Sequence, residues 1–246
     1  MTDAYRFDES STEQAIAYAK IYAGENYSPA METVLKVAFS EKRNLPTFRL
    51  KSSDTILLSG YMKKWVGAYL AGYNNRPSVR TGNCSGTHPD PMAKTILRAR
   101  IPGLENNLAD KIVAGHSLLM TIENNIGELL EEYLAVKLSP LGWYCCWGST
   151  IDAVDFCKAD GSLLQMKTSD NSENSSSSRV RQGTPIEKWF RRFSRRPGVY
   201  NWESLNRMLG RPGYVSESDF RAFAEKTIAA NPACIYIAAN HLLNRP

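Results

Sequence analysis

The spacing of apolar residues predicts three helices in the first part of the chain. Apolar side chains recur at steps of three and four residues in the segments 12–22, 29–39 and 55–71, as expected for helices that bury one face. Ser11 or Thr12 can cap the first of these helices. The following stretch, 72–91, is rich in glycine, asparagine, serine and proline, so we interpret it as a surface loop.

A longer helix is predicted from residue 106 to residue 138, because apolar residues recur at helical spacing along it. Pro140 and Gly142 then end the helical pattern. Three short apolar stretches follow and are interpreted as strands: 143–147, 153–158 and 162–167. Between the last two strands, the pair Asp160-Gly161 is typical of a tight hairpin turn.

Two more elements are expected near the end of the chain. A basic amphipathic helix is predicted from Pro185 to about Phe193, with Thr184 as its N-cap. An apolar run from Ala233 to Ala239 is interpreted as a further strand. The order of these elements predicts an α/β (α+β) fold, a mixed β-sheet flanked by helices and preceded by a helical N-terminal region.

The length of 246 residues fits one large domain, or a core with one appendage. We divide the chain into a helical N-terminal region, 1–105, and a core that carries the predicted strands, 106–246. No apolar run approaches the roughly 20 residues that span a membrane, and the polar N-terminus carries no secretory signal. We therefore expect a cytoplasmic protein with no membrane partner.

The charge of the chain is concentrated in one segment. Residues 179–196 hold seven basic side chains and one acidic side chain, a net charge of +6, so the remainder carries −1 against a total of +5. A basic segment of this kind favours a polyanionic partner. A solvated helix face is the ordinary alternative, but the segment directly follows a candidate catalytic strand, which favours DNA.

The predicted hairpin brings together side chains that suit phosphodiester hydrolysis. Gln165 and Lys167 share one face of their strand because strand side chains alternate, and Asp155 lies on the neighbouring antiparallel strand. Magnesium prefers oxygen ligands, commonly one or two carboxylates. A nearby lysine can orient the attacking water or meet the negative charge that develops. The spacing D-x(9)-Q-x-K alone is common, and a solvated hairpin face is its usual explanation.

The setting of the hairpin favours a catalytic site. Upstream, Gly127 and Glu131 lie on one face of the predicted helix, where a small residue permits close approach and a carboxylate can reach the sheet. Glu128 and Glu132 compete for the same role. Downstream, the loop 171–178 holds Asn, Ser and Glu side chains, which can reach base edges and phosphates. The arginine cluster that follows suits contacts with the phosphate backbone.

Two sets of residues also resemble a known family. One is the helix segment 124–133, and the other is the run from Asp155-Phe156 through Leu164-Gln165-Met166-Lys167 to the Asn-Ser-Glu-Asn-Ser loop and Lys188-Trp189. Over about 124–189 the chain resembles the SinI-like type II restriction endonucleases. The resemblance implies a PD-(D/E)XK core, Mg²⁺ dependence and a homodimer that cleaves double-stranded DNA in a bacterial restriction–modification system. It further implies the short palindromic site GGWCC, cut to leave 5′ overhangs, and a separate cognate methyltransferase.

The resemblance also implies roles for single residues. Asp155 corresponds to the principal metal ligand, Glu131 to the carboxylate from the helix and Lys167 to the catalytic lysine. Gln165 occupies the place of the usual second acid; because an amide is a poorer magnesium ligand, Glu131 gains importance. The region 106–246 is then the catalytic core, and the N-terminal region, 1–105, is a candidate for DNA contact or dimerisation. The expected DNA contacts of the core come from the polar loop and the basic segment: Asn171, Glu173, Asn174, Ser175, Ser176, Arg179, Arg181, Lys188, Arg191 and Arg192.

Two other functions stay open at this point. A repair or junction nuclease that recognises DNA shape would use the same chemistry without a discrete fragment pattern. A DNA-binding protein that has lost catalysis would carry Gln165 as the mark of that loss. The retention of Asp155 and Lys167 beside a polar loop argues against the second alternative.

Overall fold

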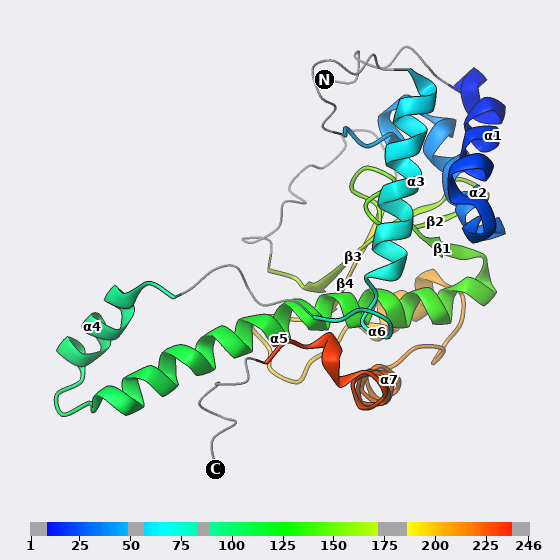
Figure 1. Ribbon diagram of the computed structural model, residues 1–246. Helices are drawn as coiled ribbons and strands as arrows, with labels where there is room; N and C mark the ends of the chain where they lie inside the picture. Colours follow the sequence, from blue (N-terminus) through cyan, green and yellow to red (C-terminus); the bar gives the residue numbers. More distant parts are fainter. Residues whose placement is uncertain (1–8, 49–56, 83–88, 172–185, 238–246) are drawn as a thin grey trace.

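A small mixed sheet lies against a long helix in the computed structural model, which describes residues 9–48, 57–82, 89–171 and 186–237 (Figure 1). The helices are α1 (Thr12–Ala23), α2 (Pro29–Ser40), α3 (Leu58–Asn74), α4 (Pro91–Arg100), α5 (Asn106–Leu138), α6 (Trp202–Met208) and α7 (Glu217–Ala230). The strands are β1 (Trp143–Cys145), β2 (Phe156–Lys158), β3 (Leu163–Ser169) and β4 (Ile186–Arg192).

The four strands form one sheet in the order β1-β2-β3-β4. Strand β2 runs antiparallel to both of its neighbours, β1 and β3, and β4 runs parallel to β3. The turn between β2 and β3 is the predicted hairpin: Gly161 has a φ of +87°, and Asp160 Oδ1 accepts a hydrogen bond of 2.9 Å from the backbone N–H of Ser162. This hairpin fixes the register between the two strands that carry the candidate catalytic residues.

The N-terminal helices are joined to the sheet by one continuous cluster of buried apolar residues. Trp65 on α3 donates its indole N–H to the carbonyl oxygen of Thr150 at 2.9 Å. Gly72 of the same helix lies so close to Gly148 that an added Cβ would stand 2.3 Å from the Gly148 nitrogen. The helix α3 is therefore locked onto the turn that follows β1.

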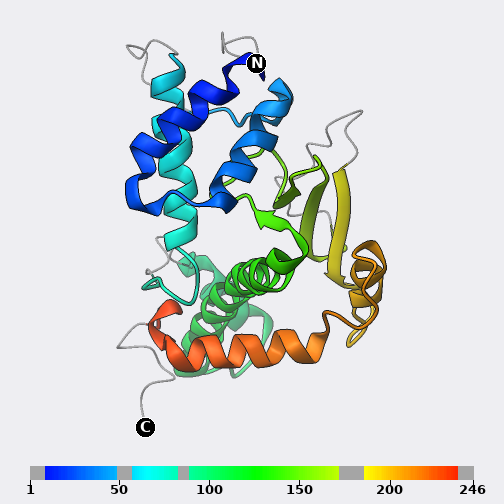
Figure 2. The same cartoon turned by 90° about the vertical axis from the view of Figure 1, so that its right-hand side faces the viewer.

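The opposite face of the sheet is covered by α5, α6 and α7, and Figure 2 shows α7 crossing beside the end-on view of α5. Tyr133 of α5 is buried there against the rings of Trp202, Phe220 and Phe223. The C-terminal half of α5 thus packs against the sheet, whereas its N-terminal half and α4 project away from the other elements (Figure 1).

Most predicted elements are confirmed. The helix predicted at 106–138 has these bounds, and the helices predicted at 12–22, 29–39 and 55–71 correspond to α1, α2 and α3 within the described residues. The three predicted strands correspond to β1, β2 and β3, with small differences at their ends. Among the described residues, no helix combines the length and the apolar character that crossing a membrane requires.

Two predicted elements are wrong. The segment from Ile186 to Arg192 is strand β4 and not a basic helix, because alternate side chains, Trp189 and Arg191, are buried. The segment from Ala233 is not a strand: Pro232–Cys234 form a short 3-10 helix, and residues 235–237 pair with no strand in the described part of the chain. The helices α4, α6 and α7 were not predicted.

Candidate active site

Asp155 is held in place from both sides by backbone hydrogen bonds. It lies directly before β2, where its N–H donates to the carbonyl oxygen of Leu164 at 3.0 Å and its own carbonyl oxygen accepts from the N–H of Cys146 at 2.8 Å. Its side chain is also fixed, because Oδ2 accepts a hydrogen bond of 2.7 Å from the backbone N–H of Met166. The carboxylate is thereby positioned against the β3 segment that contains Gln165 and Lys167.

The β3 side chains alternate as predicted. Met166 packs against the core, opposite the buried Trp189 of β4. Gln165 is 7% exposed and Lys167 is partly exposed, and both belong to the other face. The positive charge of Lys167 is close enough to Asp155 to lower the pKa of its carboxyl group.

The three candidate acids on α5, Glu128, Glu131 and Glu132, have different partners. Glu128 pairs with Arg80, and Glu132 accepts from the hydroxyl of Ser78 and, at 3.0 Å, from its backbone N–H. Both acids therefore hold the loop that follows α3. Glu131 instead contacts β1, where Cys145 Sγ donates to its Oε1 at 3.4 Å. Of the three competing carboxylates, Glu131 is the one on the Asp155 side of the helix.

Gly127 lies where α5 packs against β3. A Cβ added at this residue would lie 3.6 Å from Cγ2 of Thr168 on β3. This is an ordinary van der Waals distance, so Gly127 lies against β3, one turn before Glu131, at a position with room for a methyl group.

Burial raises the pKa of both carboxyl groups. The pKa of Asp155 is raised to about 6, although the Met166 N–H and Lys167 partly offset the effect of burial. The pKa of Glu131 is raised to about 7 by burial and then by the negative charge of Asp155, while the Cys145 thiol acts in the opposite direction. Two desolvated carboxylates that repel each other are a favourable setting for a divalent cation, which would relieve both penalties.

The donor set suits magnesium and not a metal that requires a closed protein cage. Within the described ranges, no three His, Cys, Asp or Glu side chains come together as a metal cluster. Magnesium commonly takes one or two protein carboxylates and completes its shell with water and phosphate oxygens. Asp155 and Glu131 fit that pattern, and the neutral Gln165 adds no charge to it.

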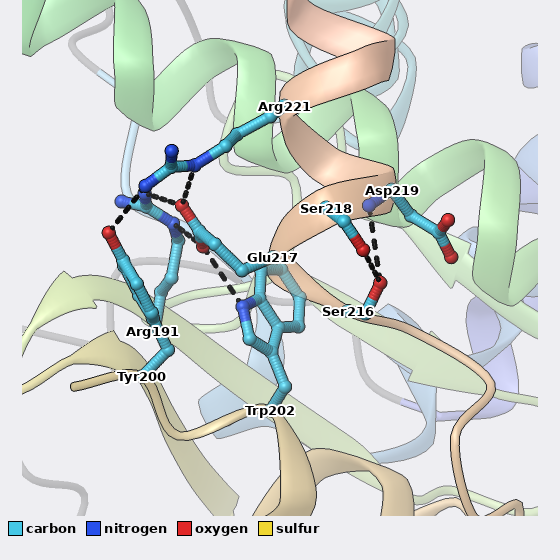
Figure 3. A network of polar contacts seen from close by, with 8 residues as sticks. All are labelled: Arg191, Tyr200, Trp202, Ser216, Glu217, Ser218, Asp219 and Arg221. Carbon is cyan, nitrogen blue, oxygen red and sulfur yellow. Dashed lines mark hydrogen bonds and ion pairs between the residues drawn. The ribbon is translucent and has the colours of Figure 1, made fainter. Parts of the chain in front are cut away.

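The basic segment is divided by β4 between two environments. By register with β3, Lys188 and Arg192 lie on the face of Gln165 and Lys167, and both are exposed. Arg191 points to the other side, where it makes two hydrogen bonds, of 2.9 and 2.7 Å, to the carboxylate of Glu217 (Figure 3). The predicted phosphate contact of Arg191 therefore does not fit the structure, because its guanidinium is already paired in the core.

The same carboxylate organises the C-terminal helices. Glu217 also accepts from the indole N–H of Trp202 at 3.0 Å and from Arg221 at 3.1 Å (Figure 3). Trp189 is likewise structural, since it is 2% exposed and donates its indole N–H to the carbonyl oxygen of Asn201. These contacts hold α6 and α7 against the back of β4.

The polar loop begins beside the end of β4. Asp170 donates its N–H to the carbonyl oxygen of Arg192 and accepts a 2.6 Å bond from the N–H of Ser194. Asn171 follows and is exposed. The other loop residues expected to contact DNA lie outside the described residues: Glu173, Asn174, Ser175, Ser176, Arg179 and Arg181.

One neighbour of the site gave no signal in the sequence. Cys145 is buried in β1, and its thiol donates a hydrogen bond to Glu131. The contact joins residues on a helix and a strand whose relative position is set by tertiary packing. Sequence spacing therefore could not identify it.

The chain is similar in sequence to known restriction endonucleases. The model of the SinI restriction endonuclease family matches residues 57–230. The chain belongs to this family. Over 144 residues it is 44% identical to the type II restriction enzyme SinI of Salmonella infantis and 42% identical to the type II restriction enzyme Eco47I of Escherichia coli. Each match covers 56% of this chain and 61% of the relative, so the chain spans less than two thirds of the length of these curated relatives.

Proposed function

We propose that the protein is a type II restriction endonuclease with a PD-(D/E)XK core. It hydrolyses phosphodiester bonds in double-stranded DNA as a homodimer. The observation that carries the proposal is the bond from the Met166 N–H to Asp155, which sets a buried carboxylate beside Lys167, with Glu131 approaching from α5. Membership of the SinI family supports the same reaction.

Asp155 and Glu131 are the residues that would hold Mg²⁺. Bound there, the ion supplies polarisation of the scissile phosphate. The ammonium of Lys167 orients the attacking water and stabilises the negative charge that develops on the phosphate oxygens. Gln165 lies between these groups in sequence and contributes a hydrogen-bonding amide in place of a second acid. Because the strands and α5 are packed rigidly, these groups are positioned before the DNA binds.

DNA contacts are proposed on the same face of the sheet. Lys188 and Arg192 are exposed there and suit backbone phosphates. We propose that the loop that begins at Asn171 reads base edges. Its contacts would come from Asn171, Glu173, Asn174, Ser175, Ser176, Arg179 and Arg181. On the strength of the family resemblance, we propose GGWCC as the site, cut to leave 5′ overhangs, with a cognate methyltransferase that protects host DNA in the bacterial cytoplasm.

The proposal is tested by digestion of a sequenced viral genome with the purified protein and Mg²⁺. Fragments whose sequenced ends share one short palindrome confirm a restriction enzyme, and their ends give the site and overhang. Asp155→Ala and Lys167→Ala are expected to abolish cleavage but to retain binding to the same duplex. Asp160→Asn and Lys158→Ala, which change exposed or half-exposed residues of the hairpin, serve as matched controls with full cleavage.

The alternatives give different results in the same experiment. Cleavage at random sequences, with a preference for junctions or distorted duplexes, would identify a shape-specific repair nuclease. Salt-sensitive binding without metal-dependent nicking would identify a non-catalytic DNA-binding protein. Retained cleavage by Asp155→Ala or Lys167→Ala would refute the assignment of the active site.

A further inference from the structure

The arm of the molecule, residues 89–124, exposes a large apolar surface. The arm consists of α4 and the first half of α5 and projects away from the other elements (Figure 1). Of its residues, all of which the structure describes, only Ala109 is buried. Eight large apolar side chains are between 36% and 61% exposed: Met92, Ile96, Ile101, Leu108, Ile112, Leu119, Met120 and Ile122.

This surface is too large for an isolated helical pair in water. Two helices packed on each other bury one strip each, and helices that are apolar on further sides normally lie inside a core or an interface. Summed over both helices, the eight side chains expose on the order of 700 Å² of apolar area. Along α5, Leu108, Ile112, Leu119 and Ile122 recur at helical spacing and therefore share one face. The summed area approaches the area of about 800 Å² that each partner contributes to a stable interface.

The charges on the arm are self-complementary. Helix α4 carries three basic side chains, Lys94, Arg98 and Arg100, and no acidic one. Residues 105–124 carry three acidic side chains and one basic side chain: Glu105, Asp110, Glu123 and Lys111. Within one arm, Lys94 pairs with Asp110 at 2.7 Å. Among the described residues, this is the one ion pair between α4 and α5. The other basic and acidic side chains of the arm can therefore pair with those of a partner.

We propose that the arm packs against the arm of a second copy of this chain, as a four-helix bundle around a two-fold axis. A two-fold interface uses the same patch on both subunits. Setting α4 of one subunit against α5 of its partner covers the apolar side chains and brings basic and acidic residues together. An acidic partner or a DNA backbone would match only the basic helix and would leave the apolar side chains unburied.

The pairing also connects the two active sites. Helix α5 runs without a break from the arm to Glu131, so the bundle fixes the two Glu131 carboxylates relative to each other. Here the inference rests on the proposed function, because cleavage of both strands of a palindrome needs two sites related by a two-fold axis. The pairing itself can be measured without DNA or metal.

The test is the molar mass of the protein in solution, measured by sedimentation equilibrium. The wild type is expected at twice the chain mass of 27.5 kDa. Ile112→Glu combined with Leu119→Glu is expected at the mass of one chain, with an unchanged circular dichroism spectrum. Ile21→Glu, which changes an apolar residue that is 70% exposed on α1, is the matched control and is expected to stay dimeric. The milder pair Ile112→Ala and Leu119→Ala is expected to weaken dimerisation at least tenfold.

A monomeric wild type, or arm variants that stay dimeric, would overturn the proposal. A wild type of single-chain mass whose arm variants lose only DNA affinity would assign the arm to DNA contact instead. A nuclease assay separates this inference from the proposed function: monomeric arm variants should nick supercoiled plasmid but form linear product much more slowly. If the arm variants dissociate and no form of the protein cleaves DNA, the pairing stands and the nuclease function fails.

Discussion

The carboxylate of Asp155 accepts a hydrogen bond of 2.7 Å from the backbone N–H of Met166, although Asp155 lies directly before β2 and Met166 belongs to β3. The carboxylate that we propose as a metal ligand is therefore oriented by the strand that carries Lys167, so the positions of the two groups are linked. One carboxylate oxygen is used in this contact. Among the described residues the other oxygen has no hydrogen-bond partner, so it is available to a ligand, as the proposed metal site requires.

This hydrogen bond leads to opposite stability effects for two substitutions of Asp155. In Asp155→Asn the amide oxygen still accepts from Met166, and a desolvated charge is removed, so the thermal midpoint at pH 8 without metal should rise. In Asp155→Ala the Met166 N–H loses its partner, which should cost about 1–3 kcal/mol. Both variants should lose cleavage. Thermal unfolding in the presence of a chelator should give the highest midpoint for Asp155→Asn, a lower one for the wild type and the lowest for Asp155→Ala. The reverse order of midpoints would contradict the assigned contact.

The raised pKa values predict how stability changes with pH when no metal is bound. The folded chain raises the pKa of Asp155 from 3.8 to about 6 and that of Glu131 from 4.5 to about 7. Between these limits the folded state holds more protons than the unfolded state, so the free energy of unfolding falls as pH rises from about 4 to 7. Glu131→Gln should flatten this decline, and thermal scans from pH 4 to pH 8 with chelator measure it.

Metal affinity should follow the opposite course. The carboxylates bind Mg²⁺ in their ionised form, so affinity should increase with pH through the range 6–7 and reach a plateau near pH 8. Calorimetric titration with Mg²⁺ at pH 5.5 and pH 8 in buffers of different ionisation enthalpy should show proton release at the lower pH. A pH-independent affinity would count against Asp155 and Glu131 as the ligands. The exposed control Asp160→Asn should leave the profile unchanged.

Two adjacent arginines on β4 should behave differently when replaced by alanine. Arg191→Ala leaves the carboxylate of Glu217 without its bidentate partner in the core, so it should destabilise the fold by about 3 kcal/mol. Arg192→Ala changes an exposed residue and should alter stability by less than about 0.5 kcal/mol. Arg192→Ala should instead weaken DNA binding and reduce the slope of log affinity against log salt by about 1. Urea unfolding measures the change in stability, and DNA binding at several salt concentrations measures the change in affinity. Equal effects of Arg191→Ala and Arg192→Ala in both measurements would contradict the different roles assigned to the two arginines.

The same pair explains where sequence reasoning failed. Thr184, Pro185 and a run of basic residues predicted a helix start, but the segment is a strand because Trp189 and Arg191 are buried at every second position. That alternation is concealed in the sequence, since a buried arginine looks like a surface charge until its partner is known. The partner, Glu217, lies 26 residues further along the chain.

Sequence patterns predicted correctly those features that depend on residues close together in the chain. The hairpin turn at Asp160-Gly161 fixed the pairing of two strands, and the long apolar periodicity gave α5 its bounds. The sequence alone does not show which of Glu128, Glu131 and Glu132 lies on the side of Asp155. That depends on a loop far away in the sequence, in which Arg80 pairs with Glu128 and Ser78 hydrogen-bonds to Glu132. The arm of residues 89–124 was likewise hidden, since α4 lies next to a stretch interpreted as loop.

The close approach of α5 to β3 gives a graded prediction at Gly127. In Gly127→Ala the new methyl group would meet Cγ2 of Thr168 at 3.6 Å, an ordinary contact, and the better helix propensity of alanine should stabilise the protein by up to about 1 kcal/mol. Cleavage should be nearly unchanged. In Gly127→Leu the larger side chain has to push the helix from the sheet and should move Glu131 away from Asp155, lowering the cleavage rate by roughly 100-fold. Pairing each variant with Thr168→Ser, which removes the opposing methyl, checks the cause: rescue of the leucine variant is expected, whereas a rate loss already present in Gly127→Ala would mean that this contact is not what positions Glu131.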